Sequence, residues 1–179
     1  MNAAAPAGHS VLQVPVPELE WFVRGRYDHY DPAYVSADPA FTHAHVTALG
    51  PFLPAAQLDD EALALVGKIA ALTEPFDFDL DRLATFPNGI IHLRPEPEAP
   101  FRALTARLVE AFPQCPPYDG HYDVAPHLTL DLASAEVTEA STRTALGAGP
   151  WSCRADRLDL AWYEPHGCRL LASWRLGER

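Results

Sequence analysis

Two short segments of the chain carry a histidine followed two residues later by a threonine. The first reads His45-Val46-Thr47-Ala48 and the second reads His127-Leu128-Thr129-Leu130. On a β-strand, alternation would place each histidine and threonine on one face and the two apolar residues on the other. Two imidazoles and two hydroxyls around one cleft suit a phosphate, because a neutral imidazole can act as base, a protonated one as acid, and hydroxyls can donate to phosphate oxygens. We therefore predict His45, Thr47, His127 and Thr129 as catalytic residues.

The elements expected around these segments follow the same order in both halves of the chain. In the first half, hydrophobic periodicity and turn residues predict a strand at 11–15, a helix from Pro17, a loop at 28–41, a strand at 44–49, a helix at 59–73 and a hairpin of strands at 76–81 and 90–93. In the second half they predict a helix at 100–112, a strand at 125–132, a helix at 134–146 and a hairpin at 158–162 and 168–176. The two histidines are 82 residues apart. The repeated order indicates two halves related by a pseudo-twofold axis, with both imidazoles facing one cleft.

Composition excludes several classes of protein. The chain has 179 residues with 24 acidic and 13 basic side chains, a formal net charge of −11, whereas a protein that binds duplex nucleic acid along its phosphate backbone is normally basic. No apolar run is long enough to span a membrane, and no secretory signal is present. Three cysteines without paired spacing argue against a disulfide framework or a zinc knuckle. We expect a cytoplasmic protein that binds neither membranes nor duplex nucleic acid.

Two further polar residues lie close to the motifs. His43 and His45 are two residues apart and would share a face, which suggests a metal site, but spacing supplies no third ligand. We therefore predict no metal and interpret His43 as a residue at the rim of the cleft. Asp131 would share the face of His127; we interpret it as a solvated carboxylate at the strand end, with the orientation of another donor as the alternative.

Two aromatic residues flank the motifs and are candidates for substrate binding. Phe52 follows the first motif and Tyr122 precedes the second, and either ring could stack on a nucleobase or pack in the core or rim. The histidines without a repeated partner are interpreted as structural or surface residues: His9, His29, His92, His121 and His166.

At these residues the sequence resembles the two-histidine phosphoesterase superfamily, in particular its 2′-5′ RNA ligase-like (LigT-like) branch. The resemblance rests on residues 44–52 (Ala-His-Val-Thr-Ala-Leu-Gly-Pro-Phe), on residues 124–130 (Val-Ala-Pro-His-Leu-Thr-Leu), and on the element order from about Val11 to Gly177. It implies an α+β fold in a single two-lobed domain over residues 1–179, each lobe an antiparallel sheet with helices on its outer face, around a central cleft. The motif strands are expected near 44–50 and 125–132, and residues 1–9 are expected to be flexible.

The resemblance also implies an activity. Members of this branch open a 2′,3′-cyclic phosphate to a 2′-phosphate without a metal or an organic cofactor, which assigns the catalytic roles to the two histidines and two threonines named above. The expected partner is a small cyclic nucleotide or an RNA 3′ end, bound by a monomer. A non-catalytic nucleotide-binding module and an RNA 2′-5′ ligase are the alternatives, since retained residues do not prove turnover.

Overall fold

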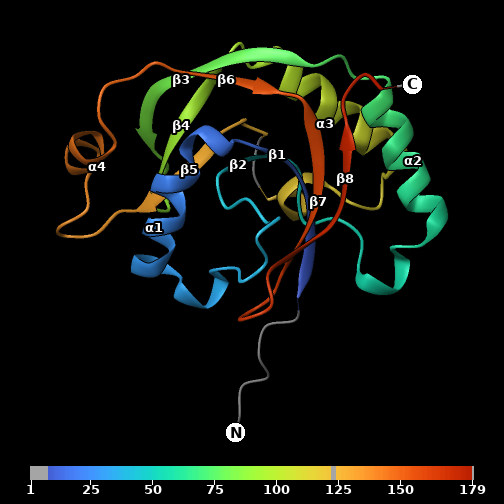
Figure 1. The fold of residues 1–179 in the computed structure, drawn as a ribbon, viewed down its shortest axis with the longest axis horizontal. Coiled ribbons are helices and arrows are strands. Elements are labelled where there is room, and N and C mark those ends of the chain that lie inside the picture. Colours follow the sequence, from blue (N-terminus) through green and yellow to red (C-terminus); the bar gives the residue numbers. More distant parts are fainter. Residues whose placement is uncertain (1–7, 122–123, 179) are drawn as a thin grey trace, which may run out of the picture.

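The chain folds around one antiparallel sheet with four α-helices (Figure 1). The computed structural model describes residues 8–121 and 124–178. The strands are β1 (His9–Pro15), β2 (His45–Leu49), β3 (Phe76–Thr85), β4 (Ile90–Glu96), β5 (Leu128–Leu132), β6 (Trp151–Ala155), β7 (Arg157–Tyr163) and β8 (Arg169–Arg175). The helices are α1 (Glu20–Tyr30), α2 (Asp60–Ala71), α3 (Ala99–Ala111) and α4 (Glu139–Leu146). No helix in the described part of the chain is long and apolar enough to cross a membrane.

The two motif strands meet at the centre of the sheet. The strand order is β6-β3-β4-β5-β2-β1-β7-β8, and β2 and β5 are joined by the single pair Val46 and Leu128. The strands β2-β1-β7-β8 form a first half-sheet and β5-β4-β3-β6 a second. The α+β fold with two antiparallel halves is thus confirmed, and the two expected sheets are continuous with each other. Each half-sheet mixes strands from both halves of the sequence, because the hairpin β3–β4 pairs with β5 and the hairpin β7–β8 pairs with β1.

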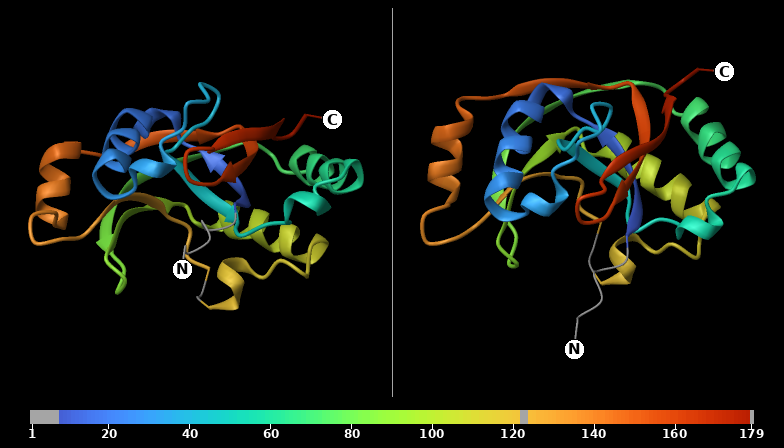
Figure 2. Two further views of the ribbon diagram at one scale, coloured as in Figure 1. Left: turned by 90° about the horizontal axis from the view of Figure 1, so that it is seen from below. Right: turned by 60° about the horizontal axis from the view of Figure 1, so that its bottom comes forward.

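Two helices pack on each half-sheet. Helices α1 and α4 lie against β5 and β3 of the second half-sheet, and α2 and α3 lie against β8 and β2 of the first. Figure 2 shows these two pairs of helices at opposite ends of the curled sheet.

The apolar sides of the motif strands form the core. Val46, Leu128 and Leu130 are fully buried, together with Leu104 on α3. The Thr105 hydroxyl of the same helix donates a buried hydrogen bond of 2.7 Å to the carbonyl oxygen of Ala48, which fixes α3 against β2. The predicted alternation is therefore correct: the apolar residues face the core, and the histidines and threonines between them are left half-buried on the other face.

Local capping explains where two helices begin. Helix α2 starts after Asp59, whose carboxylate accepts from the backbone N–H of Ala62 at 2.9 Å, close to the predicted boundary. Helix α4 starts later than predicted, because Thr138 and Ser141 form a capping box there. The Ser134 hydroxyl instead accepts from the backbone N–H of Val137 at 3.1 Å and closes a turn before the helix.

Several boundaries differ from those predicted. Helix α1 continues to Tyr30, into the segment expected to be a loop, and β6 was not predicted at all. Strand β5 starts at Leu128, after Pro126, which has no N–H to offer a neighbouring strand. His9, within the range expected to be flexible, begins β1 and pairs with Tyr163, while residues 1–7 lie outside the described residues.

Replacing Leu128 by alanine should destabilise the fold by about 2–5 kcal/mol, because it leaves a cavity where the two half-sheets join. Urea denaturation measures this loss. The control is Leu72→Ala, since Leu72 is 57% exposed and its replacement should change the free energy of unfolding by about 0.5 kcal/mol or less. Equal losses of stability in Leu128→Ala and Leu72→Ala would contradict the central role of the Val46–Leu128 pair.

Candidate active site

The pairing of Val46 with Leu128 determines how the two motifs meet. In an antiparallel pair with this register, His45 lies opposite Thr129 and Thr47 lies opposite His127. Directly opposed side chains have Cβ atoms about 4.5–5.5 Å apart and diagonal ones about 7–8 Å, so the two histidines occupy one diagonal of a small four-cornered site. The structure thus brings together the four residues predicted as catalytic.

Both imidazoles make the same contact with the backbone. The Nδ1 of His45 lies 2.7 Å from the carbonyl oxygen of His43, and the Nδ1 of His127 lies 2.7 Å from the carbonyl oxygen of Ala125. A carbonyl oxygen only accepts hydrogen bonds, so each Nδ1 carries the hydrogen. Within the described residues neither Nε2 has a hydrogen-bond partner, which leaves this nitrogen of each ring to exchange a proton with a ligand.

Burial keeps both imidazoles neutral. It lowers the pKa of His45 to about 4, and the nearby His127 adds to this effect. Burial also lowers the pKa of His127, with a further contribution from the positive charge of Arg94. A bound anion would favour the protonated form of one ring, because an opposite charge stabilises the imidazolium. The site is therefore able to hold one neutral and one protonated imidazole once a phosphate is present.

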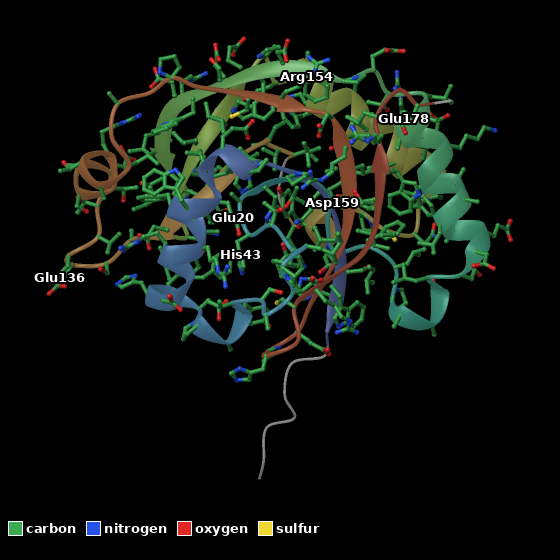
Figure 3. All side chains as sticks on the ribbon, viewed as in Figure 1. Glu20, His43, Glu136, Arg154, Asp159 and Glu178 are labelled. Carbon is green, nitrogen blue, oxygen red and sulfur yellow. The ribbon has the colours of Figure 1, made fainter. Side chains whose placement is uncertain are left out.

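The His43 side chain is buried next to the backbone segment that contacts His45. Its predicted place at the rim of the cleft is wrong. It is 2% exposed; its Nδ1 donates to the Glu20 carboxylate at 2.7 Å and its Nε2 accepts from the backbone N–H of Ser36 at 3.0 Å. The other oxygen of Glu20 accepts from the N–H of Ala44 at 2.7 Å. Figure 3 shows Glu20 and His43 side by side. Helix α1 thus fixes the peptide segment that holds the Nδ1 of His45.

These contacts bear on the possibility of a metal at His43 and His45. Both ring nitrogens of His43 are engaged within the protein, so it has no lone pair to offer an ion. Over residues 8–121 and 124–178, no group of three or more His, Cys, Asp or Glu side chains is placed to hold a metal.

Three of the four motif residues line one cavity of about 290 Å³, namely His45, Thr47 and Thr129. His127 lies outside its lining, edge-on to the ring of Phe86 at 4.9 Å and stacked at 6.4 Å on Tyr118. Tyr118 and Thr47 line a neighbouring cavity of about 450 Å³. His9, Val11 and Thr47 line both cavities, so the two lie next to each other, with His45 in the lining of the first.

Of the two residues predicted to stack on a nucleobase, the structure describes Phe52 but not Tyr122. Phe52 is buried in the core, with its ring edge-on to Phe112 at 4.8 Å, so its predicted role in substrate binding is wrong. The Phe52 side chain packs in the apolar core cluster that also contains residues of α3. Tyr122 lies outside the described residues. Tyr118 and Phe86, which the sequence did not single out, are described aromatic residues beside His127.

Asp131 is not the solvated carboxylate that was expected. It is 1% exposed, forms an ion pair with Arg26 of α1, and lies 3.5 Å from the Nδ1 of His29. Strand β5 shifts register against β4 between Thr129 and Asp131, so simple alternation from His127 does not place this side chain. The long-range contact with α1 could not be read from the sequence.

Other residues around the histidines were also missed or undervalued. Tyr163 donates to the Oε1 of Gln13 at 2.6 Å and its hydroxyl lies 3.5 Å from the Nδ1 of His45. His9, expected to be a structural or surface residue, is exposed, stacks on Tyr163 and lines both cavities. His92 is buried, stacks on Phe86, and lies edge-on to His127 with ring centres 5.4 Å apart. In the sequence, the one signal for these ring contacts is the alternation of aromatic and apolar residues along the strands that carry Tyr163, His9 and His92.

Comparison with models of protein families shows to which family the chain belongs. The model of the 2′-5′ RNA ligase superfamily matches residues 15–167. The chain belongs to the 2′-5′ RNA ligase superfamily. Membership in this superfamily implies a phosphoesterase-type enzyme. Among curated protein sequences no match is found.

Solved structures share the fold of this 2′-5′ RNA ligase superfamily member. TT0787 of Thermus thermophilus is 21% identical, with a TM-score of 0.63, and the match covers 94% of this chain and 98% of that one. E. coli LigT in complex with 3′-AMP is 18% identical, with a TM-score of 0.59 and coverages of 94% and 97%. E. coli LigT in complex with NADP+ gives 19% identity, a TM-score of 0.57 and coverages of 94% and 98%. The matches extend over nearly the whole of each chain.

The shifted pKa of His45 has a measurable consequence. Its imidazole should titrate near pH 4 in an NMR pH series, with His45→Gln used to assign the signal, instead of near the ordinary value of about 6.5. Between pH 4 and pH 6.5 the unfolded chain binds more protons at His45 than the folded protein does. The contribution of this residue to the free energy of unfolding is therefore complete above about pH 6.5 and is lost as the pH falls through about 4. A midpoint near 6.5 in the free protein would contradict the burial of this ring.

Proposed function

We propose that this protein is a metal-independent cyclic phosphodiesterase that opens the 2′,3′-cyclic phosphate of a nucleotide or an RNA 3′ end to a 2′-phosphate. The observation that carries the proposal is the equivalent setting of His45 and His127, each with Nδ1 bound to a backbone carbonyl and Nε2 available. Support also comes from the fold shared with E. coli LigT, whose structures contain 3′-AMP, ATP and NADP+, all small nucleotides.

The reaction needs two proton transfers, one at each imidazole. The neutral Nε2 of one histidine takes a proton from water as the water oxygen bonds to phosphorus. The protonated Nε2 of the other gives its proton to the 3′ oxygen of the ribose as the bond from phosphorus to that oxygen breaks. The Thr47 and Thr129 hydroxyls donate to the non-bridging oxygens, where negative charge accumulates in the transition state. Cleavage at the 3′ oxygen follows from the family resemblance.

Replacing either histidine by alanine should lower kcat by about 10²–10⁴, because each change removes one proton transfer. The double variant should lose less than the product of the two single losses, since both groups act on one transition state. Chromatography of nucleoside 2′,3′-cyclic phosphates and their products measures the rates. Thr47→Val and Thr129→Val should lower the rate and leave the shape of its pH profile unchanged, because a hydroxyl does not titrate in this range.

Near-full turnover by His45→Ala or His127→Ala would rule out the two-histidine mechanism. If every variant binds nucleotide and neither they nor the native protein turn over any cyclic phosphate, the non-catalytic nucleotide-binding module takes its place. Joining of RNA ends by the native protein under the same conditions would instead support the ligase.

Activity should survive exhaustive treatment with EDTA, because side chains supply the acid, the base and the donors to the phosphate. The same chromatographic assay, run before and after chelation and then with added Zn²⁺ or Mn²⁺, provides the measurement. Loss of activity that an added ion restores would show that the ion generates the nucleophile and would refute this mechanism.

A further inference from the structure

The cavity that holds His45 extends away from the motifs to the end of α1. Its walls there are formed by Tyr27, Tyr30 and Asp31. The volume of the whole cavity, about 290 Å³, lies just below the range of ligand pockets, roughly 300–1,000 Å³. With a cyclic phosphate at His45, Thr47 and Thr129, the rest of a bound nucleotide would lie toward this end of the cavity.

The charges in this part of the cavity disfavour a second phosphate. None of the described residues that line it is a lysine or an arginine, and two of them, Asp31 and Asp131, are acidic. Asp131 is already paired with Arg26 and accepts from the backbone N–H of Leu132 at 2.8 Å. The Asp31 carboxylate forms no hydrogen bond or ion pair with any residue the structure describes. Of the two carboxylates, Asp31 is therefore the one that remains available to a ligand.

The surroundings of Asp31 suit a planar ring. The side chains of Tyr27 and Tyr30, whose ring centres are 5.2 Å apart, line the cavity together with Asp31. The Tyr30 hydroxyl oxygen is buried, which raises the pKa of this group, and it interacts with the Tyr27 side chain. A base in this place would meet apolar faces together with polar atoms at its edge.

An ionised carboxylate only accepts hydrogen bonds, so it selects for donors. Guanine presents two adjacent donors on one edge, the N1–H and the exocyclic amino group, which match the two oxygens of a carboxylate. Adenine and cytosine place a ring-nitrogen acceptor beside their amino group, and uracil places its single N–H between two carbonyl oxygens. We propose that Asp31 makes the enzyme selective for guanosine 2′,3′-cyclic phosphate, or for an RNA end that terminates in guanosine. This inference rests on the proposed function.

The test compares kcat/KM for the four nucleoside 2′,3′-cyclic phosphates and for the inosine analogue, which lacks the exocyclic amino group. The native enzyme should prefer guanosine over each of the other three by about 10- to 100-fold, with inosine between. In Asp31→Asn this preference should fall to about threefold or less.

The matched control is Asp28→Asn, an exposed carboxylate on the same helix that does not line the cavity, which should retain the native preference. Equal turnover of all four substrates by the native enzyme would overturn the inference and leave the proposed function intact. An equal loss on all four in Asp31→Asn would assign Asp31 a structural role and also overturn it.

Failure of the proposed function would give a result distinguishable from failure of the guanosine selectivity. If no cyclic phosphate is hydrolysed, calorimetry with guanosine 2′-phosphate and cytidine 2′-phosphate still tests Asp31. Tighter binding of the guanosine compound by the native protein, and its loss in Asp31→Asn, would support the base selectivity without catalysis. Equal affinities would reject the selectivity as well.

Discussion

The structure depends on the one place where its two halves touch as strands. Among the described residues, only Val46 and Leu128 join β2 to β5, yet this pair does two things at once. Its side chains are buried in the common core, and its register places the neighbouring histidines and threonines opposite one another on the other face. A shift of one residue would turn the motif side chains of one strand into the core. The same hydrophobic contact therefore stabilises the fold and sets the geometry of the site.

The sequence was most informative where side chains alternate on a strand or recur along a helix. The apolar stripes of α2 and α3 and the alternation around His45 and His127 predicted these elements and the sharing of one face. The exchange of hairpins between the half-sheets was beyond such reasoning, because a repeat in sequence does not tell which strands pair. Phe52, His43 and Asp131 were misjudged for a related reason: each is placed by a contact with a distant element, namely Phe112, Glu20 and Arg26.

Electrostatics explains how an acidic protein can present a phosphate site. The net charge of −11 is spread over the molecule, where salt screens it beyond about 8–10 Å. The two imidazoles are neutral in the free protein, since burial lowers the pKa of both histidines. An entering phosphate supplies the negative charge that favours protonation of one ring. In the proposed reaction the acid would thus form together with the complex, and two residues of the same type would play different roles.

Helix α1 makes the two equivalent motifs unequal. At its start, Glu20 binds His43 and Ala44 and so steadies the segment before His45. Further along the helix, Arg26 pairs with Asp131, beyond Thr129 on the other motif strand. A single rigid helix thus spans both half-sheets and closes one side of the site, where its last residues line the cavity. His127 packs instead on Phe86 and His92, which belong to the β3–β4 hairpin. In the proposed reaction the matched motifs would supply the two proton transfers, and the different surroundings of His45 and His127 would make the two sides of the site unequal to a substrate.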